Sequence, residues 1–127
     1  MYLSPYALNW LAGKMAAEAI TISAHTAAPG NDGTAAELSS AGGRNYARKA
    51  VAANRWTAAG ATSDNDNVET VFTPNATSAG DVVTHLGYWL GANFFGWVQL
   101  AAPVTLVRGE PFRIASGTMD FTFELAK

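Results

Sequence analysis

The stretch that decides the fold is residues 80–103, GDVVTHLGYWLGANFFGWVQLAAP. No Asp, Glu, Lys or Arg occurs anywhere in residues 82–107. On length alone, such a run could cross a membrane as a helix. However, Asn93, Gln99 and several glycines interrupt it, and its β-branched and aromatic residues are typical of strands. We therefore predict two strands joined at residues 91–93.

Both faces of this predicted hairpin are largely apolar. An antiparallel sheet with one wet face alternates apolar and polar side chains, and this hairpin does not. We therefore expect both faces to be covered, one by the core of a sandwich and the other by the N-terminal helix, a long loop or a second subunit. The candidates for an oligomer interface are three aromatic residues, Trp89, Phe95 and Trp97.

The rest of the chain predicts one helix followed by short strands. Ser4 and Pro5 mark the start of a helix, which we expect over about residues 4–18. Clean alternation predicts a strand at residues 20–25, followed by a long loop at 27–43, a strand at 44–56 and a polar turn region at 58–67. Further strands are expected at residues 68–73, 104–107, 112–115 and 118–125. The pattern predicts a mainly β protein, an antiparallel β-sandwich or jelly-roll-like single domain over residues 1–127, with an N-terminal arm and helix at 1–18 and the sandwich at 19–127.

Composition excludes several classes of protein. The chain has 127 residues, so one domain is the simplest prediction. It has no cysteine, which excludes disulfides, and a net charge of −2, which argues against a nucleic-acid partner. We expect no membrane segment and no signal peptide. Four of the eight basic residues form a patch that is either a solvated strand face or a surface for an acidic partner: Arg44, Arg48, Lys49 and Arg55.

The sequence offers little for catalysis. It contains no cysteine nucleophile, nucleophile elbow, phosphate-binding loop or zinc-type spacing of histidines. Its two histidines, His25 and His85, fall in or at the end of predicted strands, where a hydrogen-bonded structural role is the simplest interpretation. We therefore expect no enzymatic activity, no metal and no cofactor.

Four motifs occur in order along the chain: HTAAPGNDG at residues 25–33, GGRNYAR at 42–48, VFTP at 71–74 and VTHLGYW at 83–89. Together they resemble a family of small tailed-phage structural proteins, which are labelled either as tail-fibre proteins or as head decoration (cement) proteins. The likeness covers nearly the whole chain from Ile20. The sequence departs from the family pattern in an inserted Arg44-Asn45 before Tyr46 and in a shortened turn after Trp89.

The resemblance implies a virion protein made in the host cytoplasm, without enzymatic activity. Because the chain shows no repeat, we predict a capsid decoration protein, which binds the capsid surface and stabilises the head. Its expected partners are the major capsid protein and further copies of itself in a homotrimer. The alternatives are a tail-fibre or baseplate module and a host-surface or carbohydrate-binding β-sandwich. The candidates for capsid contact lie in the N-terminal arm and the long loop: Tyr2, Leu3, Tyr6, Trp10, Pro29, Asn31 and Asp32.

Overall fold

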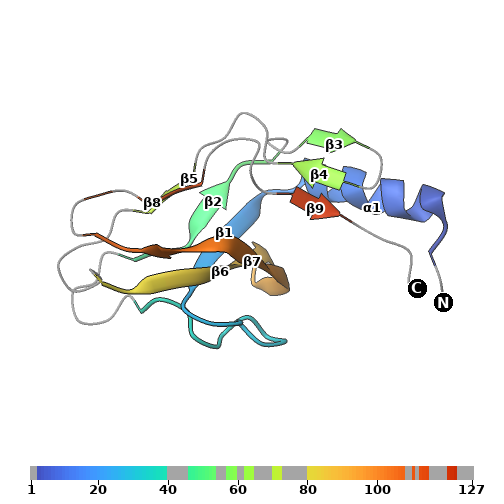
Figure 1. The fold of residues 1–127 in the computed structure, drawn as a ribbon. Helices are drawn as coiled ribbons and strands as arrows, with labels where there is room; N and C mark the ends of the chain where they lie inside the picture. Colours follow the sequence, from blue (N-terminus) through green and yellow to red (C-terminus); the bar gives the residue numbers. More distant parts are fainter. Residues whose placement is uncertain are drawn as a thin grey trace. The chain divides into compact units, whose positions relative to one another are not determined.

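The computed structural model describes residues 3–39, 46–53, 57–59, 62–64, 70–72, 80–107, 110, 112–114 and 120–122. Within these ranges the chain is mainly β, as predicted, with one N-terminal helix and nine strands (Figure 1). The elements are α1 (Pro5–Ala17), β1 (Ile20–His25), β2 (Lys49–Val51), β3 (Thr57–Ala59), β4 (Thr62–Asp64), β5 (Thr70–Phe72), β6 (Val82–Leu90), β7 (Asn93–Thr105), β8 (Phe112–Ile114) and β9 (Asp120–Thr122). The chain divides into two compact units, one from residues 1–19, 51–70 and 114–127 and the other from 20–50 and 71–113.

The first unit contains α1, which begins where the sequence predicts. Ser4 is the N-cap, and its Oγ accepts a hydrogen bond from the Ala7 amide at 3.2 Å. Pro5 takes the first helical position, where a missing N–H costs nothing. The cap thus provides one of the acceptors that the first turn of a helix lacks.

The buried face of α1 lies against β3 and β4 of the same unit. Its buried residues recur at helical spacing: Leu8, Ala12, Met15 and Ala16. The strands β3, β4 and β9 form a three-stranded antiparallel sheet. The prediction of a polar turn over residues 58–67 was therefore wrong in part, because short strands pair on either side of residues 60–61. Sequence alternation over three residues is too short to reveal such strands.

The second unit contains a four-stranded sheet in the order β2-β1-β6-β7 (Figure 1). The predicted hairpin is confirmed as β6 and β7, which pair antiparallel around a turn at Gly91, whose φ is +60°. β1 pairs antiparallel with β6 in a register that sets His25 opposite His85 and Ser23 opposite Gly87. One face of these central strands carries fully buried apolar residues: Ile20, Ile22, Ala24, Leu86 and Tyr88.

Two predicted strands differ from the structure within the described residues, and a third is described only in part. β7 continues through Pro103 to Thr105 rather than stopping before it, which is possible because Pro is tolerated in a strand at the edge of a sheet. Within the described part of the strand predicted over 44–56, residues 46–53, only β2 is a strand, and the residues just before Lys49 are held by side-chain contacts instead. Of the final strand predicted over 118–125, the described part is β9.

A two-layer sandwich is not confirmed, and the single-domain organisation stays a prediction. Within the described ranges, β5 and β8 form a separate two-stranded sheet. Over those same ranges, no helix is both long enough and apolar enough to span a membrane.

Candidate functional site

The residues after β1 form an ordered loop that folds back onto β1. The Thr26 amide donates to the Ala36 carbonyl at 2.9 Å, and the Leu38 amide donates to the Ala24 carbonyl at 3.0 Å. Glu37 forms an isolated antiparallel bridge with His25. The described part of this loop, residues 26–39, thus packs beside β1 and contacts side chains of the sheet. We call it the cover loop.

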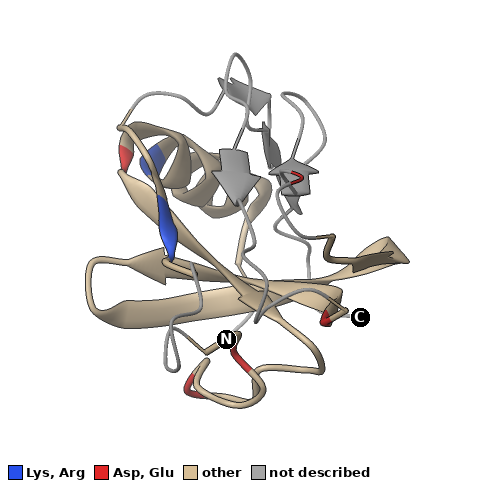
Figure 2. Ribbon diagram, turned by 90° about the vertical axis from the view of Figure 1, so that its left-hand side faces the viewer, with Lys and Arg blue, Asp and Glu red and all other residues tan. Residues whose placement is uncertain are grey.

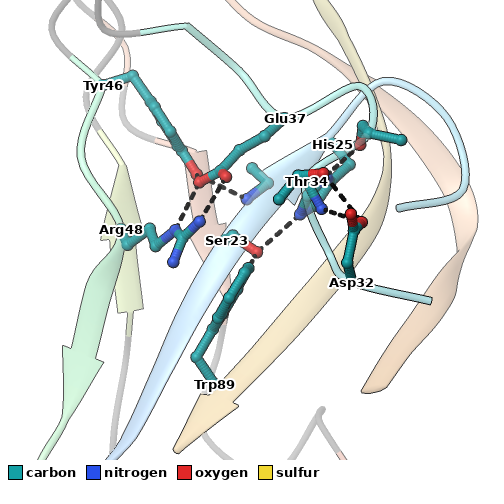
Figure 3. Close-up of polar contacts among 10 residues, drawn as sticks. Ser23, His25, Asp32, Thr34, Glu37, Tyr46, Arg48 and Trp89 are labelled. Atoms are coloured by element: carbon teal, nitrogen blue, oxygen red, sulfur yellow. Dashed lines mark hydrogen bonds and ion pairs between the residues drawn. The ribbon is translucent and has the colours of Figure 1, made fainter. Parts of the chain in front are cut away.

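A buried chain of hydrogen bonds runs from the cover loop to β6 (Figure 3). His25 Nδ1 lies 2.9 Å from the Ala35 carbonyl, which can only accept, so Nδ1 carries the hydrogen. Nε2 then accepts from Ser23 Oγ at 2.7 Å, and Ser23 Oγ accepts from Trp89 Nε1 at 2.8 Å. Burial lowers the pKa of His25 and keeps the imidazole neutral, as this tautomer requires.

A second cluster is centred on the Glu37 carboxylate. Arg48 donates to it from Nε and Nη2, both at 2.7 Å, and Tyr46 donates from its hydroxyl at 2.8 Å (Figure 3). Burial by itself raises the pKa of Glu37, but the hydrogen bonds from Arg48 and Tyr46 outweigh it and hold the pKa below its usual value. The Tyr46 hydroxyl also accepts from the Ala24 amide at 3.1 Å, and burial raises the pKa of Tyr46. The carboxylate therefore ties the cover loop to the segment that leads into β2.

The Trp89 ring joins the two clusters. The Arg48 guanidinium stacks 3.6 Å above its centroid, and Phe94 packs edge-on at 5.0 Å. A cation over an indole face is attracted by the negative charge of the π system. Hydrogen bonds and stacking thus connect β1, β6, the cover loop and residues 46–48 in one continuous network. We call it the His25–Trp89 network.

Two glycines make room for this network. A Cβ at Gly87 would overlap Ser23 Oγ and lie 2.9 Å from His25 Nε2. A Cβ at Gly33, in the cover loop, would overlap the ring of Phe94, and the φ of Gly33 is +75°. Any larger residue at either position has to displace a side chain of the network.

The Ser23–His25 pair has the distance of a catalytic dyad but not the access. Both residues are 0% exposed, so no substrate carbonyl can reach Ser23 Oγ. The prediction that His25 is a hydrogen-bonded structural histidine is confirmed. The sequence gives no acidic partner for a metal site, and the described residues contain no group of three or more His, Asp or Glu that could hold a metal ion.

The expected capsid-contact residues occupy different environments. Tyr6 and Trp10 are 78% and 54% exposed on α1, with Lys14 Nζ 5.3 Å from the Trp10 ring. Asn31 and Asp32 are exposed in the cover loop. The Asp32 carboxylate accepts from the Thr34 amide and hydroxyl, which lowers its pKa.

Two other candidates of that set are less accessible. Pro29 is fully buried and Leu3 is half-buried, so Pro29 offers almost no surface to a partner. Tyr2 lies outside the described residues.

The candidates for the oligomer interface and for the basic patch also differ in how exposed they are. Phe95 and Trp97 are exposed on β7, whereas Trp89 is 5% exposed and has its contacts inside the protomer. Arg48 is engaged by Glu37 and Trp89, while Lys49 is exposed. Arg44 and Arg55 lie outside the described residues. The sequence analysis placed Trp89 and Arg48 in surface roles. Each lies in one of the family motifs, Arg48 in the same motif as Tyr46, and these motifs were the signal that could have brought them together.

Comparison with known proteins identifies the family. No curated protein and no solved structure matches the chain. A family model described as "Podophage GP4 fiber I protein gp80" matches residues 1–122. The match indicates that the chain is a phage virion structural protein, and it fits the tail-fibre alternative better than the capsid-decoration prediction. Since the match spans nearly all of the 127 residues, the chain belongs to the family of the podophage GP4 fiber I protein gp80.

Proposed function

We propose that this protein is a non-enzymatic structural component of a phage tail fibre. The observation that carries the proposal is the family match over residues 1–122, in which the four sequence motifs are included. The geometry supports it, because the only serine–histidine pair that the described residues bring within hydrogen-bonding distance is sealed from solvent. Burying such a pair stabilises a fold and gives no route to a substrate.

The His25–Trp89 network has a role suited to a structural protein. It fixes an irregular cover loop, which exposes Asn31 and Asp32, against a regular sheet. Loops held on a rigid scaffold are the usual carriers of recognition in proteins. We infer that the network keeps this loop in one conformation at the surface of the fibre component.

The exposed aromatic residues of α1 are the proposed contact with a neighbouring virion protein. Tyr6 and Trp10 lie one turn apart on the side of the helix away from its buried face. Aromatic side chains supply much of the free energy of protein–protein interfaces. The matched substitutions are Trp10→Ser and Asn9→Ser, because Asn9 is exposed on the same helix turn. We expect loss of the protein from assembled virions for the first only.

The location is tested by quantitative mass spectrometry of purified virions separated into head and tail fractions. We expect the peptides of this protein in the tail fraction, at a copy number similar to that of other tail components. A signal confined to the head fraction would overturn the tail-fibre proposal and favour a capsid decoration protein that contacts the major capsid protein. Absence from both fractions would contradict any virion role.

A further inference from the structure

An exposed tryptophan on β7 lies beside two polar side chains of the same sheet face. Trp97 and Gln99 are two residues apart on β7, and Gln99 is opposite His85 of β6. Residues two apart on a strand, and residues directly opposite on its neighbour, point to the same face of a sheet. Trp97 is 46% exposed, Gln99 is exposed and His85 is half-buried, so all three are accessible from solvent.

The Trp97 ring is held in one orientation by its neighbours. Its centroid lies 5.1 Å from that of the His85 ring, in a T-shaped contact at 67°. The His85 ring is fixed in turn, because its Nδ1 lies 2.7 Å from Thr84 Oγ1. One neighbour in this arrangement covers at most one face of the indole. A side chain that is already ordered loses little conformational entropy when a ligand stacks on it.

Gln99 and His85 supply hydrogen-bonding groups next to this ring. The Gln99 amide both donates and accepts, and its side chain has no hydrogen-bond partner among the described residues. The His85 ring uses Nδ1 for Thr84 and has a second nitrogen, Nε2. Residues two apart on a strand are separated by roughly 6.5 Å, so one ligand ring stacked on the indole comes within reach of the amide.

The charge of the two strands restricts the ligand. Residues 82–107 contain no Asp, Glu, Lys or Arg, and Figure 2 shows this hairpin without charged residues. A nucleic acid stacks its bases on aromatic rings but also needs Lys or Arg for its phosphates. A quaternary ammonium group is usually enclosed by a cage of several aromatic rings. A purely apolar ligand would leave the amide and the imidazole without hydrogen bonds.

We propose that Trp97, Gln99 and His85 form a binding site for a neutral saccharide. A pyranose ring has a face of C–H groups, which stacks on the negative face of an indole, and hydroxyl groups around its rim, which donate and accept hydrogen bonds. The indole is therefore the platform, and the amide and the imidazole bind the hydroxyl groups. Because the site is open and small, we expect a Kd of about 1 mM.

The first test follows the indole N–H signals of the full chain by two-dimensional NMR. The probes are short β-linked oligosaccharides of glucose, galactose, mannose and N-acetylglucosamine, each added up to about 10 mM. The Trp97 signal, assigned by its absence in Trp97→Phe, should shift and saturate with at least one of them. The Trp89 signal is an internal control, because its Nε1 donates to Ser23 inside the protein and should not shift.

The second test compares three variants with the sugar that binds best. Trp97→Ala should abolish saturable binding, and Gln99→Ala should raise Kd by at least about fivefold. The matched control is Val98→Ala, which removes an exposed apolar side chain from the opposite face of β7 and should leave Kd unchanged. Far-UV circular dichroism and thermal melting establish that the variants are folded. If Trp97→Ala does not fold, Gln99→Ala and its control still decide the result.

A Trp97 signal that stays in place with all four sugars at about 10 mM overturns the proposal. Equal weakening of binding by Val98→Ala and Gln99→Ala overturns the placement of the site. A short oligothymidylate or choline that binds more tightly than every sugar overturns the ligand class. Each result is independent of whether the protein is found in the tail fraction of virions.

Discussion

Adding one methyl group at Gly87 tests the His25–Trp89 network directly. In Gly87→Ala the new Cβ overlaps Ser23 Oγ and approaches His25 Nε2 to 2.9 Å and Phe94 Cε2 to 3.2 Å. Ser23 Oγ can move away by a change of rotamer, but this breaks its hydrogen bonds to His25 and Trp89. The substitution therefore has to distort the hydrogen bonds that these side chains make.

The expected cost follows from two contributions. Overpacking of a well-packed site costs roughly 1–3 kcal/mol. Separation of Ser23 Oγ from its partners adds roughly 1–3 kcal/mol for a buried polar group left without a hydrogen bond. Because relaxation reduces both contributions, we expect a loss of about 2–4 kcal/mol in the free energy of unfolding. For a chain of this size, that is a fall in Tm of roughly 10 °C.

The matched control is Gly96→Ala. Gly96 lies on β7, opposite Tyr88, and a Cβ there has no heavy atom within 4 Å. Its replacement by alanine should be neutral or stabilising by about 0.5–1 kcal/mol, because alanine reduces the entropy of the unfolded chain. Both variants are compared by urea unfolding followed by circular dichroism and tryptophan fluorescence. Equal stability of the two variants would refute the close packing around Gly87.

Three further predictions concern the polar groups of the site. Ser23→Ala should cost roughly 1–3 kcal/mol, because Trp89 Nε1 loses its acceptor. Urea unfolding checks it, with Thr105→Ala, at an exposed position of β7, for comparison. Glu37→Gln should cost about 1–2 kcal/mol, whereas Glu18→Gln, at an exposed position, should cost little; a similar loss in both would contradict the role of the carboxylate. The free energy of unfolding should not depend on His25 above pH 6.5, and it should fall below that pH, because the unfolded chain then binds a proton that the buried His25 resists. The stability that comes from Glu37 should be lost below about pH 4.5, as the pH falls through its lowered pKa. Melting curves against pH and an NMR titration of His25 measure this; a pKa of 6.5 or higher for His25 would contradict the buried neutral imidazole.

Much of the fold could be predicted because local rules decide it. The cap at Ser4, the alternation over residues 20–25 and the uncharged hairpin each specify an element without help from distant residues. The expectation that the hairpin is covered on both faces followed from the same pattern. Near His25 and Gly87 the covering element on one side is the cover loop.

The site could not be predicted from local rules, because its contacts join residues far apart in the sequence. Ser23 and Trp89 are 66 positions apart, and Glu37 and Arg48 are 11 apart. Arg48 looked like part of a basic surface because sequence spacing does not reveal a carboxylate contributed by a loop. Trp89 looked like an interface residue because both faces of the hairpin are apolar, and the sequence does not say which of them the chain covers itself.

The motifs that carry the family resemblance are now explained by strand register. β1 pairs with β6 so that His25 lies opposite His85, which brings the HTAAPGNDG and VTHLGYW motifs side by side. Tyr46 and Arg48 of the GGRNYAR motif reach the same place through Glu37. The network residues within these motifs therefore specify how the cover loop is held, whereas Asn31 and Asp32 of the first motif are exposed.

The motif residues that make internal contacts and the exposed residues have separate roles in this chain. Four residues of these motifs, His25, Tyr46, Arg48 and Trp89, are engaged in internal contacts, so two members that share them can still bind different partners. What differs in binding must then come from positions that the network does not use, which in this chain include Tyr6, Trp10, Asn31 and Trp97. Exchanging such exposed residues between members should change what the protein contacts while leaving Tm nearly constant, because surface substitutions typically change stability by less than about 0.5 kcal/mol. Exchanging network residues one at a time should lower Tm while leaving the contacts with other proteins nearly unchanged.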